Sequence, residues 1–88
     1  MMLKITTIRE NRAEVLLKLE GKITEQWAAL LDRECRSFLR NKKVVRLDCS
    51  NVAFIDTRGV EVLKNLPQKQ VTLISAPSYV TELLQIGG

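Results

Sequence analysis

The sequence contains no histidine. Histidine is the side chain that most often performs general acid–base catalysis, and it is also the commonest metal ligand. The two cysteines, Cys35 and Cys49, do not form a CxxC pair. Without such a pair and without histidine, none of the usual zinc ligand sets can be assembled. These absences argue against a zinc site and against an acid–base enzyme.

Other absences further restrict the kind of protein that this sequence can encode. Aromatic residues make up 5% of the sequence, so a core must be built mainly from Leu, Val and Ile. No apolar run approaches the ~20 residues that a membrane-spanning helix needs, and the first residues lack the pattern of a secretion signal. There is also no glycine-rich phosphate loop and no carboxylate pair beside a nucleophile. We therefore expect one domain over residues 1–88, located in the cytoplasm, without cofactor, metal or membrane insertion, and with both cysteines reduced in the core.

Basic residues are more numerous than acidic ones, which gives a net charge of +4. Many of them cluster around the end of one expected helix and the turn after it, where cations complement the helix C-terminus. No aromatic residues alternate with them, as a surface that stacks nucleic-acid bases would require. We therefore interpret the cluster as a solvated basic face rather than as a nucleic-acid site. Its members are Arg33, Arg36, Arg40, Lys42, Lys43 and Arg46.

Hydrophobic periodicity predicts an α/β fold. Strands are expected at residues 3–8, 13–19, 44–49 and 70–75, and helices at 25–40, 57–66 and 78–86, with Thr24 and Ser78 as N-caps. The short polar connection between the first two strands predicts an antiparallel hairpin. Strands that alternate with helices predict right-handed parallel crossovers afterwards. The expected fold is a four-stranded, mostly parallel sheet with an N-terminal hairpin, in the order β-β-α-β-α-β-α.

In such sheets the functional crevice lies outside the carboxyl ends of the parallel strands. Three loops are expected there, at residues 21–24, 50–56 and 76–78. The second loop leads into a helix through Asp56 and Thr57, where we expect Asp56 to act as the N-cap. Gly59 is costly inside a helix, by ~1 kcal/mol relative to Ala, so it indicates that the helix approaches the sheet closely. The outward face of this helix is expected to present Thr57, Arg58, Glu61, Lys64 and Asn65.

This stretch resembles the STAS domain, the fold of bacterial anti-sigma-factor antagonists. The resemblance rests on the strand at residues 44–48 followed by Phe54-Ile55-Asp56-Thr57-Arg58-Gly59, and on the upstream Leu19-Glu20-Gly21-Lys22-Ile23. Antagonists of this family carry a phosphorylated hydroxyl residue after the aspartate, and that position corresponds to Thr57. The sequence departs from the family pattern at Arg58, where many antagonists have a small residue. A long cation there could pair with a phosphate on Thr57 or could obstruct a close-fitting kinase.

The resemblance implies a non-catalytic regulatory module that binds a protein partner. The partner would be an anti-sigma-factor serine/threonine kinase. Alternatively, in the short MlaB-type branch, it would be the ATPase of an ABC phospholipid transporter. The expected partner-binding residues are Lys22, Ile23, Thr24, Asp56, Thr57, Arg58, Glu61 and Lys64.

Two other readings remain open at this point. Asp56 could accept phosphate as a response-regulator aspartate does, although no acidic pocket for magnesium is evident beside it. The hairpin edge could instead pair with a second copy of the chain to form a homodimer.

Overall fold

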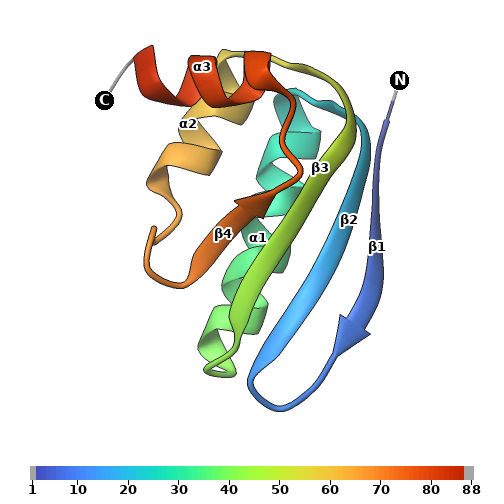
Figure 1. Cartoon of the computed structure of the whole chain (residues 1–88), viewed down its shortest axis with the longest axis vertical. Helices are drawn as coiled ribbons and strands as arrows, with labels where there is room; N and C mark the ends of the chain where they lie inside the picture. Colours follow the sequence, from blue (N-terminus) through green and yellow to red (C-terminus); the bar gives the residue numbers. More distant parts are fainter. Residues whose placement is uncertain (1, 87–88) are drawn as a thin grey trace.

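The computed structural model describes residues 2–86. It contains seven elements in the predicted order: β1 (Leu3–Glu10), β2 (Glu14–Ile23), α1 (Glu25–Arg40), β3 (Val44–Ile55), α2 (Thr57–Asn65), β4 (Val71–Ile74) and α3 (Ser78–Ile86). Figure 1 shows them in sequence colours. The residues that the structure describes include no helix long and apolar enough to cross a membrane.

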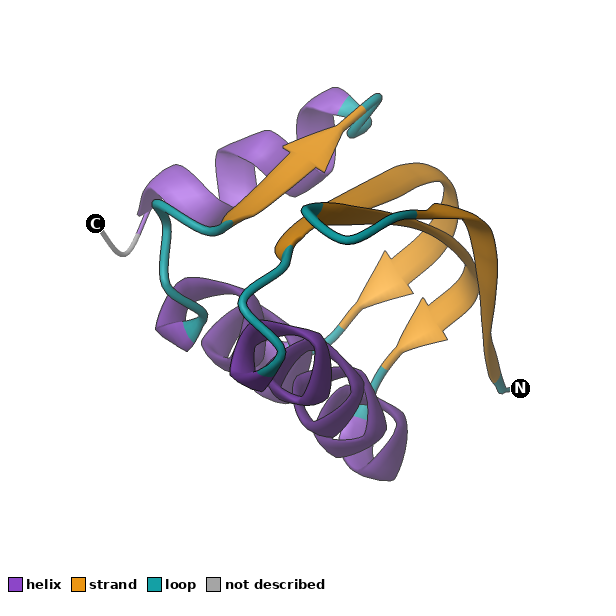
Figure 2. Cartoon of the chain, turned by 90° about the horizontal axis from the view of Figure 1, so that it is seen from below, coloured by secondary structure: helices purple, strands orange, loops and turns teal. Residues whose placement is uncertain are grey.

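The four strands form one sheet in the order β1-β2-β3-β4. β1 and β2 are antiparallel, whereas β2 pairs with β3, and β3 with β4, in parallel. The predicted hairpin and parallel crossovers are therefore confirmed. Helices α1 and α2 lie together on one face of the sheet, and α3 lies next to α2 beyond the end of β4 (Figures 1 and 2). The carboxyl ends of β2 and β3 thus meet the starts of α1 and α2 at one end of the molecule.

The core lies between the sheet and helices α1 and α2. Alternate residues of β2 (Val15, Leu17, Leu19) point into it, as the period of two in a strand requires. From α1 it receives Ala28, Leu31 and Cys35, which follow helical spacing. Cys49 of β3 is fully buried as well. Burial raises the pKa of both thiols to about 12, and both cysteines are free, as expected for small core residues.

Three strands are longer than the sequence predicts, and β4 (Val71–Ile74) is shorter. β1 continues by two residues beyond Ile8, to Glu10. β2 runs through Gly21 to Ile23, and β3 continues to Ile55 instead of ending at Cys49. The expected loops at residues 21–24 and 50–56 are therefore mostly strand, and only one residue separates each strand from the helix that follows it. Gly21 does not end β2 because it has φ +108, which lets the strand continue past the backbone of Met2.

The extra length of β3 includes two bulges. Its pairing with β2 shifts by one residue between Asp48 and Asn51, and again between Val52 and Phe54. At the first shift the Asp48 carboxylate accepts a hydrogen bond from the Ser50 amide at 3.0 Å. This bond lowers the pKa of Asp48 and closes a local turn of the kind that Asx residues form. The buried residues of β3 after Cys49 are consequently Val52 and Ile55, at intervals of three rather than two.

Smaller differences lie at the helix ends. Thr24 occupies the N-cap of α1 with extended backbone, but its side chain makes no capping hydrogen bond. Ser78 is the first residue of α3 rather than its cap, because the carbonyl oxygen of Pro77 accepts the first helical hydrogen bonds, from Val80 and Thr81. Leu66, predicted as the last residue of α2, has extended backbone in advance of Pro67.

Candidate functional site

Asp56 ties together the starts of two helices. It is the N-cap of α2, and its Oδ1 accepts the Gly59 amide hydrogen at 2.8 Å. Its Oδ2 accepts the amide hydrogen of Glu25, the first residue of α1, at 3.1 Å. One carboxylate thus supplies the cap that Thr24 does not provide. The predicted structural role of Asp56 is confirmed, and it extends to a second helix 31 residues away in the chain.

Glu25 has an unusual backbone conformation at this junction, with φ +48. Residues other than glycine rarely adopt a positive φ, and the conformation persists where surrounding contacts hold it. The hydrogen bond from its amide to Asp56 is such a contact. The hydrogen bond between Glu25 and Asp56 therefore holds the starts of α1 and α2 together.

Gly59 brings α2 against the sheet. A Cβ atom at this position would lie 2.7 Å from Cγ2 of Ile55 and would collide with the backbone carbonyl oxygen of Ile23. The predicted close approach of this helix to the sheet is confirmed. The first turn of α2 therefore packs directly on the last residues of β2 and β3.

On the outward side of this first turn, the side chains face solvent. Thr57, Arg58 and Glu61 are exposed, and Thr57 is the first residue of the helix. Asn65 is also exposed, while Lys64 is half-buried. The predicted outward face of α2 is therefore present. Thr57 and Arg58 lie on the first turn of the helix, which Asp56 caps and Gly59 packs against the sheet. Glu61 lies one turn later on the same face.

The end of β2 contributes less to this surface than the sequence predicts. Lys22 and Thr24 are half-buried, but the Ile23 side chain is fully buried, with 0% exposure. Ile23 faces the core because it continues the inward alternation of β2 through Gly21. We therefore remove Ile23 from the predicted contact residues and give it the role of supporting Gly59.

Phe54 is a surface residue that the sequence interpretation missed. It pairs with Lys22 across the sheet, and 51% of it is exposed. Aromatic side chains, phenylalanine among them, are enriched in the buried cores of protein–protein interfaces. Its exposure could have been predicted from the neighbouring Ile55, because only one of two consecutive strand residues can face the core. We define the docking edge as Lys22, Phe54, Thr57, Arg58 and Glu61.

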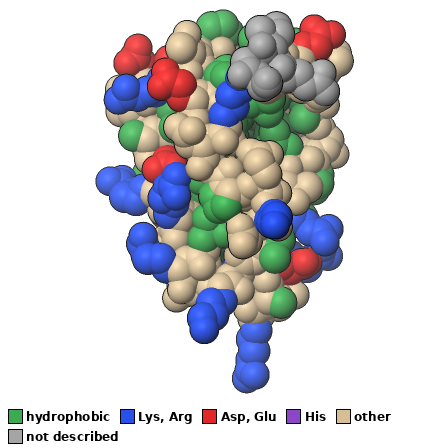
Figure 3. All heavy atoms as spheres, turned by 90° about the vertical axis from the view of Figure 1, so that its left-hand side faces the viewer, with side chains coloured by type: hydrophobic (Ala, Val, Ile, Leu, Met, Phe, Trp, Pro, Cys, Tyr) green, Lys and Arg blue, Asp and Glu red, His purple; other side chains and the backbone are tan. Residues whose placement is uncertain are grey.

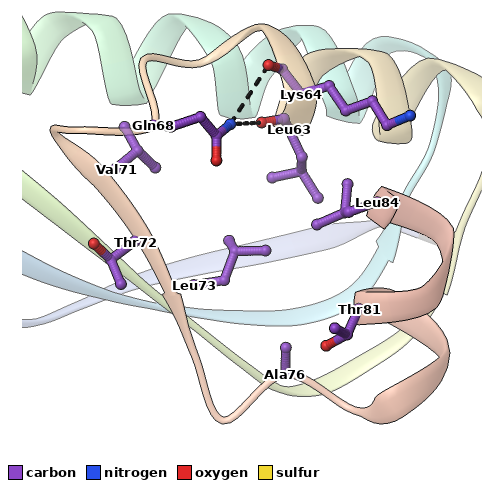
Figure 4. Close-up of a pocket in the computed structure, with 9 residues that line it drawn as sticks. All are labelled: Leu63, Lys64, Gln68, Val71, Thr72, Leu73, Ala76, Thr81 and Leu84. Carbon is purple, nitrogen blue, oxygen red and sulfur yellow. Dashed lines mark hydrogen bonds between the residues drawn. The ribbon is translucent and has the colours of Figure 1, made fainter. Parts of the chain in front are cut away.

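An apolar hollow of about 650 Å³ lies beyond the far end of α2, among α2, β4 and α3. Leu63, Leu73 and Leu84 line it, and Lys64 lies at its rim (Figure 4). The Gln68 side chain beside it donates to the carbonyl oxygens of Leu63, Lys64 and Leu66, and so satisfies the last turn of α2. Lys64 follows Glu61 of the docking edge by three residues along α2, so the hollow lies one turn beyond that edge.

The described residues offer no group of three or more His, Cys, Asp or Glu side chains that could hold a metal ion. Next to Thr57 of the docking edge, both oxygens of the Asp56 carboxylate accept backbone hydrogen bonds. The Asp56 carboxylate is therefore engaged in holding the starts of α1 and α2 together.

Comparison with known proteins agrees with this fold. The profile of the family described as "Mlab, STAS domain" matches residues 6–88. No curated protein matches the chain. One similar solved structure is that of the anti-sigma factor antagonist SpoIIAA in its unphosphorylated form, with a TM-score of 0.70 and 13% sequence identity. The match covers 96% of this chain and 84% of that one.

Proposed function

The chain belongs to the MlaB-type STAS domain family, and from this premise we propose that it is a non-catalytic regulatory module that binds a protein partner through the docking edge. The observation that carries the proposal is the first turn of α2. There Thr57 and Arg58 are exposed to solvent, while Asp56 caps the turn and Gly59 packs it against the sheet. A rigid edge loses little conformational entropy when it binds, which favours recognition.

The docking edge combines the features of a protein contact. Phe54 offers a large exposed apolar side chain near the end of β3, and Arg58 and Glu61 present charges of both signs on the first two turns of α2. Binding energy in protein interfaces concentrates on a few aromatic and arginine side chains. We therefore assign Phe54 the anchoring role and Arg58 the polar contact, with Lys22, Thr24 and Lys64 at the margin.

The partner that the family match supports is the ATPase of an ABC phospholipid transporter, as in the MlaB-type branch. In this function Thr57 contacts the ATPase directly and needs no phosphate. Arg58 then replaces a small residue with a cation that can pair with a carboxylate on the partner. The chain regulates the ATPase by holding one of its surfaces, and the chemistry belongs to the ATPase.

The test is co-purification of the tagged chain with the ATPase of an ABC phospholipid transporter from the same organism. We expect Arg58→Glu and Phe54→Ser to abolish co-purification, and Arg33→Glu to preserve it. Arg33 is an exposed arginine of α1 outside the docking edge, so it is a matched control for the charge reversal. Undiminished co-purification of both docking-edge variants would remove this edge from the proposed function.

A second candidate partner is an anti-sigma-factor serine/threonine kinase that phosphorylates Thr57. One observation favours it: Thr57 is exposed at the first position of a helix, where the helix dipole and the neighbouring Arg58 favour a phosphate. The similar structure of an anti-sigma factor antagonist in its unphosphorylated form supports the same idea at the level of the fold. A phosphate at Thr57 would add negative charge beside Asp56 and would block docking rather than alter the fold.

Kinase action has a direct readout. The chain is incubated with the purified kinase and ATP, and its intact mass is measured. The expected result is the addition of one phosphate to the wild type and none to Thr57→Ala. Thr7→Ala, an exposed threonine of β1, serves as the control and should still be phosphorylated. A wild type that gains no phosphate, together with ATPase co-purification, assigns the docking edge to the transporter alone.

A further inference from the structure

The end of the molecule opposite the docking edge concentrates positive charge. We call it the basic pole and define it as residues 8–14, 40–46 and 67–70, which comprise the three turns at the amino ends of β2, β3 and β4. These segments contain seven basic and two acidic residues, a net charge of +5. The rest of the chain contains seven basic and eight acidic residues, a net charge of −1. The whole excess of positive charge therefore lies at one end.

The two acidic residues of the basic pole are already paired. Glu10 binds Nζ of Lys43 at 2.7 Å, and Glu14 lies 3.5 Å from Arg46. The ion pairs found between residues 2 and 86 include none of the other five cations of the pole, and all five are exposed. These five are Arg9, Arg12, Arg40, Lys42 and Lys69. Figure 3 shows Lys and Arg side chains crowding the lower part of one side of the molecule, while most Asp and Glu lie in the upper part.

The basic pole also exposes aliphatic side chains. Ile8 lies at the bulge of β1 and is 53% exposed, and Val44 at the start of β3 is 37% exposed. A hollow of about 470 Å³ opens beside Val44, and its lining joins Lys42 and Lys43 to Leu39 and Pro67. Cations that alternate with aliphatic surface match a membrane interface, where phosphate headgroups overlie hydrocarbon.

Nucleic acid is a poorer match for this surface. Binding to single strands relies on aromatic side chains that stack on bases, and none of the chain's aromatic residues falls within the segments of the basic pole. We propose that the basic pole binds the surface of a bilayer that contains anionic phospholipids. In this binding mode, which is peripheral, the five free cations contact headgroup phosphates, and Ile8 and Val44 reach the interface.

The position of the basic pole leaves the docking edge free. β2 and β3 run from the pole, at Glu14 and Val44, to the docking edge, at Ile23 and Ile55. The molecule is 32 Å long, several times the screening length of about 8 Å at physiological salt. A protein partner at one end and a bilayer at the other can therefore be bound together, and neither contact depends on the other.

The experiment is co-sedimentation of the full chain with vesicles of phosphatidylcholine alone and of phosphatidylcholine mixed with phosphatidylglycerol. We expect binding only to the anionic vesicles, and weaker binding as salt rises. Each Lys or Arg near an anionic surface contributes about 1 kcal/mol, so Arg40→Gln with Lys42→Gln should lower the partition coefficient ~30-fold. Charge reversal to Arg40→Glu with Lys42→Glu should remove binding.

The matched control reverses two exposed cations outside the pole, Lys4→Glu with Arg33→Glu. It has the same net charge as the reversed pole variant, so only the position of the charges differs. Retained binding by this control supports the proposal, whereas an equal loss in both reversals overturns it. Binding of a DNA or RNA duplex in place of anionic vesicles at the same salt also overturns it. Circular dichroism shows whether the variant with Arg40→Glu and Lys42→Glu is folded. If it is unfolded, the variant with Arg40→Gln and Lys42→Gln provides the test instead.

Discussion

Gly59→Ala tests the close approach on which the docking edge depends. In a helix with open space around this position, alanine would stabilise the protein by up to about 1 kcal/mol. The structure requires the opposite sign, because the added Cβ lies 2.7 Å from Cγ2 of Ile55 and against the carbonyl oxygen of Ile23. The carbonyl belongs to the sheet backbone and cannot rotate away. Overpacking of this kind costs about 1–3 kcal/mol, which the gain of about 1 kcal/mol from alanine partly offsets, so we expect a net loss of up to about 2 kcal/mol.

Thermal and urea unfolding measure this change. For a domain of this size a loss of 1 kcal/mol lowers Tm by about 4–8 °C. Glu61→Ala is the control, because it lies on the exposed face of the same helix and should change stability by less than about 0.5 kcal/mol. Higher helix propensity would raise the free energy of unfolding, whereas overpacking would lower it. The sign of the measured change therefore shows which effect dominates. A Gly59→Ala variant with a higher Tm than the wild type would show that α2 does not touch the sheet here.

Three further predictions concern stability. Asp56→Ala removes the acceptor for two helix-start amides and should cost about 1–2 kcal/mol in urea unfolding, with Asp56→Asn milder because one acceptor oxygen remains. Tyr79→Phe removes the 2.6 Å hydrogen bond from the Tyr79 hydroxyl to the carbonyl oxygen of Val52, and should cost about 0.5–1.5 kcal/mol. Burial raises the pKa of the Cys35 and Cys49 thiols from 9.0 to about 12, so above pH 9 only the unfolded chain releases these protons. The free energy of unfolding should therefore fall as pH rises from 9 to 12, by about 1.4 kcal/mol per thiol per pH unit, and the double alanine variant should lack this part of the slope.

The order of elements could be predicted because each segment shows a clear hydrophobic period. Residues 25–40 follow helical spacing and Ala13 to Leu19 alternate, and both patterns depend only on neighbours in the sequence. The direction of the side chains at the end of β2 could also have been predicted. Continuing its alternation past Gly21 places Ile23 inward, and the structure buries it there. The prediction stopped at Gly21 because glycine usually marks a turn, whereas here it permits a positive φ inside a strand.

The candidate site also combines features that local sequence patterns predict with one feature that they do not. The N-cap at Asp56 and the close packing at Gly59 follow from local rules about helix starts and about glycine. The second bond of Asp56, to the amide of Glu25, joins residues 31 positions apart. No local pattern contains that information, because it arises from two parallel strands that end side by side. The capping residue of α1 could therefore not be read from the residues next to that helix.

The bulges of β3 connect the fold to the docking edge. Strict alternation from Val45 would point Asn51 and Ala53 into the core, and a buried amide without partners is costly. The first bulge, held by Asp48, turns Asn51 outward and puts Val52 in its place. One bulge alone would then bury Phe54 and expose Ile55. The second bulge restores the original phase, so that Ile55 packs beneath Gly59 and Phe54 faces solvent on the opposite side of the strand. The two bulges together therefore replace Asn51 by Val52 in the core and leave Phe54 exposed, as it would be in a strand with strict alternation.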